Sequence, residues 1–476
     1  MEKPKVAVIG GGISGLVCVF KLLELKEQNK KDFEVLLFEK EMRLGGTIET
    51  LEKDGFTLER GPDSFISEKP WGVELCNKLG IQNEIIGTRN ENRKSFIVRR
   101  KKLIPLPEGF YLVAPTQMKA FLRTPLFSFP GKLRMMMEPM VPRNSSDADE
   151  SVACFLRRRF GNEALERVGQ PMLAGIYTGD PETLSMTATM PRFRELEKKY
   201  GSVLKGLLQA AENKSEKLKE AGGPRYSLFL SFKRGMETLT RALAARLPQG
   251  TARLGAGIKE ISRDKFSGPW RIVLATGQIS VADAVCLTTS ARSAAGFLNN
   301  TSQSLSKKLG FITYESVATV NLAYRRDPIT HTLDGFGFVV PRTEESVLVA
   351  CSFSSQKYDF RAPEGAVLLR AFVGGAFGRE FFNRDDGELL DKVKKELAEL
   401  LGIKAEPLFT VLRRYPDSMV QYRVGHLELV KEIENEVVKC PGLFLTGSSY
   451  RGVGIPDCIA DAERTAARIL DYLNRL

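Results

Sequence analysis

The sequence predicts an α/β fold that begins with a Rossmann-like dinucleotide-binding unit. A short apolar run rich in β-branched residues, at positions 5–9, leads into a glycine-rich turn and then a helix-forming stretch. A second apolar run, at 33–38, ends in the acidic residue Glu39. Strand, turn and helix in this alternation are typical of a parallel sheet. A chain of 476 residues also exceeds what one core usually serves, so we expect two or three domains.

The first turn has the pattern of a pyrophosphate-binding loop. Gly10, Gly12 and Gly15 stand in the G-x-G-x-x-G spacing. The first glycine allows a tight turn, the second lets a pyrophosphate approach the backbone, and the third lets helix and strand pack closely. The helix that follows adds free N–H groups and the positive end of its dipole. Glycine-rich turns also serve as plain loops, so this interpretation depends on the residues around it.

Glu39 and the residues after it support the interpretation. Glu39 lies close to the ~20-residue offset expected for a carboxylate that binds a ribose hydroxyl. Residues 43–47 then form a second glycine turn, which a simple nicotinamide enzyme does not need. The segment from Glu39 through Arg43 to Gly46 resembles the continuation found in FAD-dependent amine-oxidase and desaturase-type flavoproteins. This resemblance implies FAD as the cofactor.

Composition excludes several classes of protein. The seven cysteines are scattered and never in C-x-x-C, which argues against a disulfide framework or a zinc site and for a reducing compartment. The first strand begins within a few residues of Met1, which leaves no room for a leader peptide. No apolar run approaches the ~18 residues that span a bilayer. We therefore expect a protein that is cytoplasmic or lies on a membrane surface.

The net charge of +12 also indicates which kinds of partner the protein could bind. No nucleic-acid-binding motif accompanies it, so nucleic acid is not an expected partner. An acidic small substrate or an anionic membrane face accounts for it as well. About half of the basic residues are expected only to solvate helices.

A Gly-Pro turn follows the two glycine turns. The strand from position 54 leads into Gly61-Pro62, and such turns expose backbone N–H groups. In the flavoprotein superfamily that the preceding residues resemble, the matching turn lies beside the isoalloxazine. A helix is expected over 71–80 and a strand hairpin over 95–103.

The segment from 108 to 140 changes in character. Aromatic and aliphatic residues alternate there with Lys119, Arg123, Lys132 and Arg134, and prolines break the segment into short helices. One interpretation is the core of a helical subdomain. The other is an interfacial patch that enters one leaflet of a membrane without spanning it. Both interpretations can hold together.

Residues 170–180 make the resemblance more specific. Gly175 and Gly179 bracket an apolar turn where another group approaches the backbone closely. Residues 175–180, Gly-Ile-Tyr-Thr-Gly-Asp, resemble the Gly-(Val/Ile)-Tyr-Ala-Gly-Asp segment of protoporphyrinogen oxidases, which those enzymes place in the substrate cavity. Residues 59–65 resemble the bacillus-type members of that family.

The resemblance extends along nearly the whole chain. Residues 334–341 match the family's Gly-Phe-Gly segment, whose phenylalanine packs on the tetrapyrrole. Residues 422–426 match a Tyr-x-Val-Gly-His block, although Val420 stands where a proline is usual. Residues 447–459 resemble the flavin-closing motif. A glycine-rich turn there opens the last helix, whose N-terminus can stabilise negative charge on a reduced flavin.

One departure from the family affects carboxylate recognition. Animal and plant members carry an arginine just before the strand near Phe96, proposed to pair with a substrate propionate, and Ser95 occupies that place here. Bacillus-type members also lack this arginine and have a lysine that matches Lys69. Lys69 is therefore the first candidate for binding a propionate, and Arg93 is the second.

The resemblance implies two sets of site residues. The residues expected to bind FAD are Gly10, Gly11, Gly12, Ile13, Ser14, Gly15, Glu39, Lys40, Arg43, Gly46, Thr47, Gly61, Pro62, Asp63, Ser64, Ile258, Ser448, Val453, Gly454 and Ile455. The residues expected to line the substrate cavity are Phe65, Lys69, Arg93, Gly175, Phe336, Val339 and Phe372. No residue is expected to act as a general acid or base and no metal is expected, because the flavin performs the hydride transfer.

The implied activity belongs to haem biosynthesis. It is the six-electron oxidation of protoporphyrinogen IX to protoporphyrin IX, with oxygen as the acceptor and hydrogen peroxide as the by-product. Coproporphyrinogen III is the alternative substrate, since bacillus-type relatives include enzymes that act on it. Another amine-oxidase-type flavoenzyme, or a porphyrin-binding flavoprotein without activity, is a further alternative. The other expected partners are the inner face of the cell membrane and a ferrochelatase, and the expected state is a monomer or a homodimer.

Three domains are expected, and two of them are assembled from separated pieces. The FAD-binding domain of amine-oxidase type is expected to comprise residues 1–67, 226–298 and 436–476. The α+β substrate-binding domain is expected to comprise residues 68–95, 191–225 and 299–435. A helical, membrane-associating domain is expected over residues 96–190.

Overall fold

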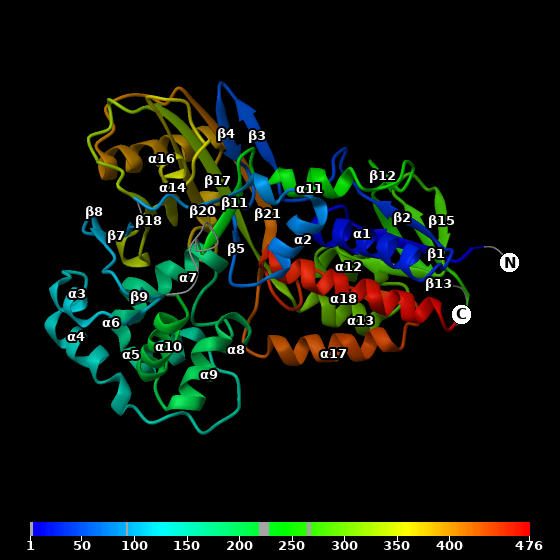
Figure 1. Ribbon diagram of the computed structural model, residues 1–476, viewed down its shortest axis with the longest axis horizontal. Coiled ribbons are helices and arrows are strands. Elements are labelled where there is room, and N and C mark those ends of the chain that lie inside the picture. The colour runs from blue at the N-terminus through cyan, green and yellow to red at the C-terminus, as the bar shows by residue number, and fades with distance from the viewer. Residues whose placement is uncertain (1–2, 92–93, 219–227, 264–267) are drawn as a thin grey trace.

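A five-stranded parallel sheet forms one end of the molecule (Figure 1). The structure is a computed structural model that describes residues 3–91, 94–218, 228–263 and 268–476. The strand order is β12-β2-β1-β16-β22, and every neighbouring pair is parallel. The strands are β1 Lys5–Ile9, β2 Glu34–Phe38, β12 Ala252–Arg253, β16 Ala284–Leu287 and β22 Leu443–Leu445.

Both faces of this sheet are covered, because its strands are apolar on both sides. Val6 and Val8 face a layer of helices, whereas Ala7 and Ile9 face further helices and a small antiparallel sheet. The first layer comprises α1 Ile13–Gln28, α2 Trp71–Leu79, α11 Glu237–Ala244 and α18 Ile455–Leu473. The second comprises α12 Ala291–Leu298, α13 Gln303–Gly310, α17 His426–Val438, β13 Ile258–Arg263, β14 Trp270–Leu274 and β15 Ile279–Ala282.

A seven-stranded mixed sheet lies beside the first sheet, in the order β21-β17-β20-β19-β18-β7-β8. Its strands are β7 Lys94–Arg99, β8 Lys102–Pro105, β17 Thr313–Arg325, β18 Gly335–Val339, β19 Ala350–Ser352, β20 Ala366–Gly374 and β21 Phe409–Gln421. Phe338 and Ala371 pack against helix α16, Asp386–Leu401. Because side chains alternate along a strand, Val339, Arg370 and Phe372 belong to the opposite face.

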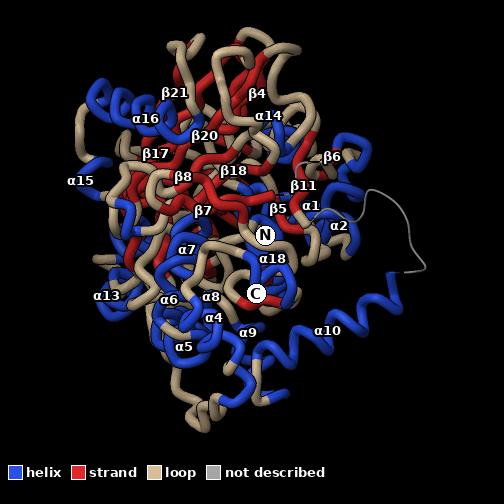
Figure 2. Tube along the Cα trace, turned by 90° about the vertical axis from the view of Figure 1, so that its left-hand side faces the viewer, coloured by secondary structure: helices blue, strands red, loops and turns tan. Residues whose placement is uncertain are grey.

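A cluster of helices lies below the second sheet in Figure 2. It comprises α3 Met118–Arg123, α4 Phe129–Met136, α5 Val152–Phe160, α6 Asn162–Ala164, α7 Gln170–Tyr177, α8 Met186–Thr189, α9 Pro191–Tyr200 and α10 Val203–Leu218, with a π-helical turn η3 at Leu165–Gly169 and a 3₁₀ turn η2 at Glu138–Met140. A fully buried ion pair between Arg159 and Glu138 joins α5 to η2. Glu138 also accepts the backbone N–H groups of Val203 and Leu204, so this charge pair fixes the start of α10.

Short elements connect these parts. They are β3 Thr50–Lys53, β4 Phe56–Glu59, β5 Phe65–Ile66, β6 Ile85–Gly87, β9 Phe110–Tyr111, β10 Ala114–Pro115, β11 Phe229–Phe232, α14 Ser354–Lys357, α15 Arg379–Phe382, η1 Gln82–Glu84 and η5 Arg342–Glu344. No helix among the described residues is long and apolar enough to cross a membrane.

The packing differs from the predicted domain boundaries in three places. The boundary between residues 95 and 96 falls inside β7, which pairs with β18 of the second sheet. Helices α9 and α10, predicted in the substrate domain, pack in the helical cluster through Phe193 and Val203. Helix α17, predicted there too, packs against the first sheet through Val430. Each difference arises from long-range packing, and part of the predicted segment 191–225 lies outside the described residues.

Candidate functional site

The first glycine turn lies at the carboxyl edge of the five-stranded sheet, where β1 meets α1. A Cβ on Gly15 would lie 1.9 Å from the Gly10 carbonyl oxygen, so only glycine fits there. A Cβ on Gly12 would meet nothing closer than the Cα of Gly46, at 3.9 Å. Helix α1 has no side-chain cap and no acidic residue in its first turn. Open space therefore adjoins unshared N–H groups and a positive dipole end, as an anion requires.

The second glycine turn is hydrogen-bonded to the first. The Gly45 N–H donates to the Gly11 carbonyl at 2.8 Å. The Arg43 guanidinium donates to the carbonyls of Leu44 and Ile48 at 3.2 Å each, and to that of Gly46. Arg43, predicted as a cofactor residue, thus supports the shape of the turn. Gly46 and Thr47 remain exposed.

Glu39 is held at the end of β2 with both carboxylate oxygens engaged. One oxygen accepts the Gly11 N–H at 2.6 Å and the other accepts the Glu41 N–H at 2.8 Å. Each oxygen keeps a further lone pair, which suits ribose hydroxyls. The Glu39 carbonyl accepts the Ala256 N–H at 2.8 Å, and this bond places the predicted residues Lys40 and Ile258 on adjacent segments.

The Gly-Pro turn adjoins the second glycine turn. A Cβ on Gly61 would lie 1.6 Å from the Thr47 carbonyl oxygen. The buried Arg370 of β20 donates to the Gly61 carbonyl and, at 3.4 Å, to that of Arg60. Thr319 of β17 donates to the Arg60 carbonyl at 3.1 Å. The second sheet is therefore anchored to this turn by its own side chains.

Asp63, in the same turn, forms an ion pair with Lys357 of helix α14. Lys357 of α14 donates to its carboxylate at 3.0 Å and Ser64 at 2.7 Å. Burial alone would raise the pKa of Asp63, but the charges of Lys357 and Arg370 outweigh it and hold that pKa well below its ordinary value. Asp63 therefore remains ionised at every working pH.

Glu59 lies two residues before Gly61, and its pKa is shifted upward, in the opposite direction to that of Asp63. Its carboxylate accepts a hydrogen bond from the Thr50 hydroxyl at 2.9 Å and from the Met236 N–H at 2.8 Å. Burial raises the pKa of Glu59 to about 7, and the Arg361 guanidinium at 3.9 Å opposes that shift.

The turn before the last helix completes the candidate cofactor site. A Cβ on Gly447 would lie 3.6 Å from the Ser14 hydroxyl, so this turn reaches the start of α1. The Tyr422 hydroxyl donates to the Ser448 carbonyl at 2.6 Å and accepts the Gly452 N–H at 2.7 Å. The turn then leads through the half-buried Val453 and Gly454 into α18, which has no side-chain cap.

These features fit a dinucleotide that carries a flavin. Three backbone turns lie in sequence along the edge of the first sheet, each in contact with the next. The open position at Gly12 adjoins one helix N-terminus, and a second helix N-terminus adjoins the Gly447 turn. The N-terminus of α1 therefore suits a pyrophosphate, Glu39 suits a ribose, and the N-terminus of α18 suits the edge of a flavin.

The structure brings three of the predicted substrate residues together. A Cβ on Gly175 of α7 would lie 3.6 Å from Val339 of β18. Val339 is paired with Ala350 of β19, and Ala350 with Phe372 of β20. Phe336 lies on the same strand as Val339. Helix α7 thus packs over the face of the second sheet that carries Phe372.

The structure does not place three more of the seven predicted substrate residues, Lys69, Phe65 and Arg93, in this group. Lys69 forms an ion pair with Asp457 at the start of α18, with its ammonium 2.6 Å from both oxygens, so its charge is already used. Phe65 is 3% exposed and packs in the core with Phe232, at 5.9 Å between ring centroids. This core position leaves it no surface for a substrate. Arg93 lies outside the described residues.

Sequence analysis missed the basic residues that hold the Gly-Pro turn. Arg370 interrupts an otherwise apolar strand, and a lone charge in such a run is a signal that it is paired. Lys357 follows a short polar stretch and gives no comparable signal. Of the two histidines, His426 is buried with its Nε2 at 2.9 Å from the Tyr450 carbonyl, and burial lowers its pKa. It is a structural residue, and no metal-binding cluster occurs in the described ranges.

Comparison with known proteins gives consistent results. A family model described as flavin containing amine oxidoreductase matches residues 13–470. The coproporphyrinogen III oxidases of Bacillus subtilis (strain 168) and Staphylococcus aureus are 33% and 35% identical to this chain, with at least 98% of each chain covered. The chloroplastic protoporphyrinogen oxidase 1 of Arabidopsis thaliana is 30% identical over 98% of this chain and 88% of its own. A crystal structure from Exiguobacterium sp. 255-15 superposes with a TM-score of 0.86 at 30% identity, covering both chains fully.

The open position at Gly12 gives the first prediction. Gly12→Ala should leave the apoprotein folded, because the new Cβ meets no protein atom closer than 3.9 Å and the backbone φ of −73° suits alanine. It should weaken FAD binding about tenfold or more, since a displaced charge-assisted contact costs ~1.5–3 kcal/mol. The measurement is FAD titration of the apoprotein, followed by flavin fluorescence. Gly296→Ala, in helix α12 with open space around it, is the matched control. Equal affinity of the two variants for FAD would contradict the placement.

Glu59 gives a prediction on stability against pH. Its pKa rises from 4.5 to about 7 on folding, so between these values the native state binds a proton that the unfolded chain has released. The free energy of unfolding should therefore fall as pH rises from 4.5 to 7, by up to about 3 kcal/mol from this group. Denaturant unfolding over pH 4.5–8 measures it. The side chain of Glu59→Gln cannot titrate, so this variant should lose that part of the dependence of the free energy of unfolding on pH. An unchanged dependence would refute the raised pKa of Glu59.

Proposed function

Because the chain belongs to the family of flavin-containing amine oxidoreductases, we propose that it oxidises a porphyrinogen to the corresponding porphyrin. Membership of this family confirms the predicted α/β fold and FAD as the cofactor.

The observation that carries the proposal is the position of Phe372. It lies two residues from Arg370 on one strand and is paired with Thr319 on the next. Thr319 donates a hydrogen bond to the Arg60 carbonyl, and Arg370 donates to the Gly61 carbonyl. Residues two apart on a strand lie ~7 Å apart on the same face. An apolar ring is thus held between the predicted flavin turn and the Gly175 contact, where a flat, largely apolar macrocycle would meet the flavin.

The chain's own contribution to the reaction is to position the substrate and to exclude water from it. Val339 and Phe372 offer an apolar surface, and Gly175 of α7 borders it without a side chain that would project over it. The chemistry that FAD supplies when bound is acceptance of a hydride and transfer of the electrons to oxygen. Holding a C–H bond at a fixed distance from the acceptor is what such a reaction requires of the protein.

We propose coproporphyrinogen III as the preferred substrate. It is the substrate named for the two bacterial relatives at 33% and 35% identity, each covered over at least 98% of its length. Protoporphyrinogen IX, favoured by the sequence motifs, is the second candidate, because the Arabidopsis thaliana relative is a protoporphyrinogen oxidase at 30% identity. The two substrates differ in carrying four and two propionates, so the basic groups around the cavity decide between them.

Turnover of the two substrates tests the proposal. Each porphyrinogen is prepared anaerobically and added to the FAD-loaded protein in air, and porphyrin fluorescence is recorded. We expect a kcat/KM at least tenfold higher for coproporphyrinogen III. A reversed preference would move the assignment to protoporphyrinogen IX. Absence of oxidation of both, with FAD bound, would refute porphyrinogen oxidase activity.

We further propose that helices α3 and α4 attach this protein to the anionic inner face of the cell membrane, the cytoplasmic side expected from the sequence. Figure 1 shows them at the end of the molecule opposite the two termini. Phe129 is 79% exposed and Met140 76%. The exposed apolar patch of these helices and of η2 comprises Met118, Leu122, Phe129, Leu133, Met137 and Met140. Lys119 and Arg123 are exposed beside it and complement anionic lipid.

Vesicle binding tests the membrane proposal. The protein should float with vesicles that contain anionic phosphatidylglycerol and bind zwitterionic vesicles less. The double variant Phe129→Asp, Met140→Asp should bind at least tenfold less, because each buried side chain of this size contributes ~1.5–3 kcal/mol. Phe311→Asp should bind like the unaltered protein, because this position is 59% exposed and follows α13, which packs on the first sheet and not in the helical cluster. Equal binding of the double variant and this control would contradict the proposal.

A further inference from the structure

A cavity of about 580 Å³ adjoins the substrate face. Helix α7 supplies Gln170 and Ala174 to its lining, and Thr178, the residue that ends this helix, lines it as well. Ala174 is the chain neighbour of Gly175, and Val340, which also lines the cavity, is the neighbour of Val339. The Val340 side chain faces away from that of Val339, but Gly374, two residues after Phe372 on the same face of β20, also lines the cavity. The cavity therefore lies at the end of the substrate face, and its volume is typical of a pocket for a small molecule.

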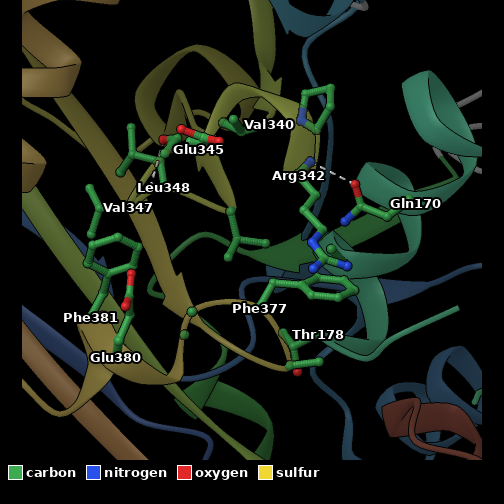
Figure 3. Close-up of a pocket in the computed structure, with 17 residues that line it drawn as sticks. Gln170, Thr178, Val340, Arg342, Glu345, Val347, Leu348, Phe377, Glu380 and Phe381 are labelled. Atoms are coloured by element: carbon green, nitrogen blue, oxygen red, sulfur yellow. Dashed lines mark hydrogen bonds between the residues drawn. The ribbon is translucent and has the colours of Figure 1, made fainter. Parts of the chain in front are cut away.

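Arg342 is the cationic group of this cavity. Its backbone N–H donates to the Gln170 side-chain oxygen at 2.9 Å, which ties the turn η5 that follows β18 to α7. Its guanidinium lies 4.6 Å from the centroid of the Phe377 ring. Figure 3 shows the guanidinium over that ring, on the side of Gln170. The side chain is thus oriented by stacking on an aromatic face.

This guanidinium has no carboxylate partner within the described part of the chain. Elsewhere the exposed arginines are commonly paired, as Arg292 is with Asp417 and Arg451 with Glu434. Glu345 and Glu380 line the same cavity, but Figure 3 shows both on the side away from Gln170. An anion in the cavity would be attracted to the Arg342 end and repelled from the other end.

We infer that Arg342 binds a propionate of the porphyrinogen and is a specificity-determining residue of this enzyme. The inference rests on the proposed function. With the macrocycle on the Val339–Phe372 face, a propionate on the adjacent edge enters the cavity beside Gly175. There the planar guanidinium offers two parallel N–H donors to the carboxylate, and Phe377 holds it in place for that contact. Lys69, the residue expected for this role, is occupied by Asp457.

Substitution of Arg342 tests the inference. Arg342→Gln should raise the KM for coproporphyrinogen III by about 10-fold to 100-fold, as expected for one charge-assisted contact. The kcat should change little, because no residue near the Gly61 turn is altered. Arg342→Lys keeps the charge and should recover part of the loss. The tetramethyl ester of coproporphyrinogen III has no carboxylate, so its KM should be the same for Arg342→Gln and the unaltered enzyme.

The control is Arg325→Gln. Arg325 is exposed and lies on β17, opposite Ala366 at the other end of the sheet from the cavity. This variant should match the unaltered enzyme. An unchanged KM in Arg342→Gln, or an equal rise for the free acid and the ester, would overturn the inference.

Failure of the proposed function can be told apart from failure of this inference. Absence of turnover by the unaltered enzyme refutes the former, and the binding of the product tests the latter without turnover. Coproporphyrin III should quench the protein fluorescence with a Kd that is raised at least tenfold in Arg342→Gln. An unchanged Kd would refute the Arg342 contact whatever the activity.

Discussion

The hydrogen bonds from Arg370 and Lys357 to the Gly61–Asp63 turn are the constraint on which the site depends. They join the second sheet to the edge of the first through charged donors, one buried and one nearly so. Such bonds are about twice as strong as neutral ones. Because Phe372 lies beside Arg370 on the same face, they also set the distance between the substrate surface and the cofactor turn. A displacement of ~1 Å at such a place can cost ~100-fold in rate.

Charge has three distinct uses in this molecule. Buried pairs fix the architecture: Arg159 and Glu138 hold the helical cluster together, and Asp63 stays ionised between its two basic neighbours. Glu59, three residues before Pro62, is also buried, but the charge of Arg361 and its hydrogen bonds do not outweigh the effect of burial on its pKa. Its protonation therefore makes the stability of the fold depend on pH. Arg342 has no carboxylate partner among the described residues, and it is the cation that we infer binds the substrate. The net charge of +12 is the excess of the 70 basic over the 58 acidic residues, so basic side chains remain for recognition after the ion pairs are formed.

The sequence predicted local features well and non-local ones poorly. The turn at Gly10–Gly15, the strand ending at Glu39 and the helix from Trp71 follow from spacing and period along a continuous stretch, and the structure has each of them. The ion pair of Lys69 with Asp457 and the packing of Phe65 on Phe232 join residues that lie far apart along the chain, and no local pattern encodes such contacts. The same holds for the domain boundaries, since α17 packs on a sheet whose first strand begins at Lys5.

The central claim is that the substrate face and the cofactor turn act as one site. Anaerobic mixing of the FAD-loaded protein with excess coproporphyrinogen III, followed by stopped-flow absorbance, tests it most directly. The account predicts that the flavin absorbance bleaches within the time of one turnover and returns when oxygen is admitted. A flavin that stays oxidised while the porphyrinogen is bound would contradict it, because the two ligands would then occupy separate sites.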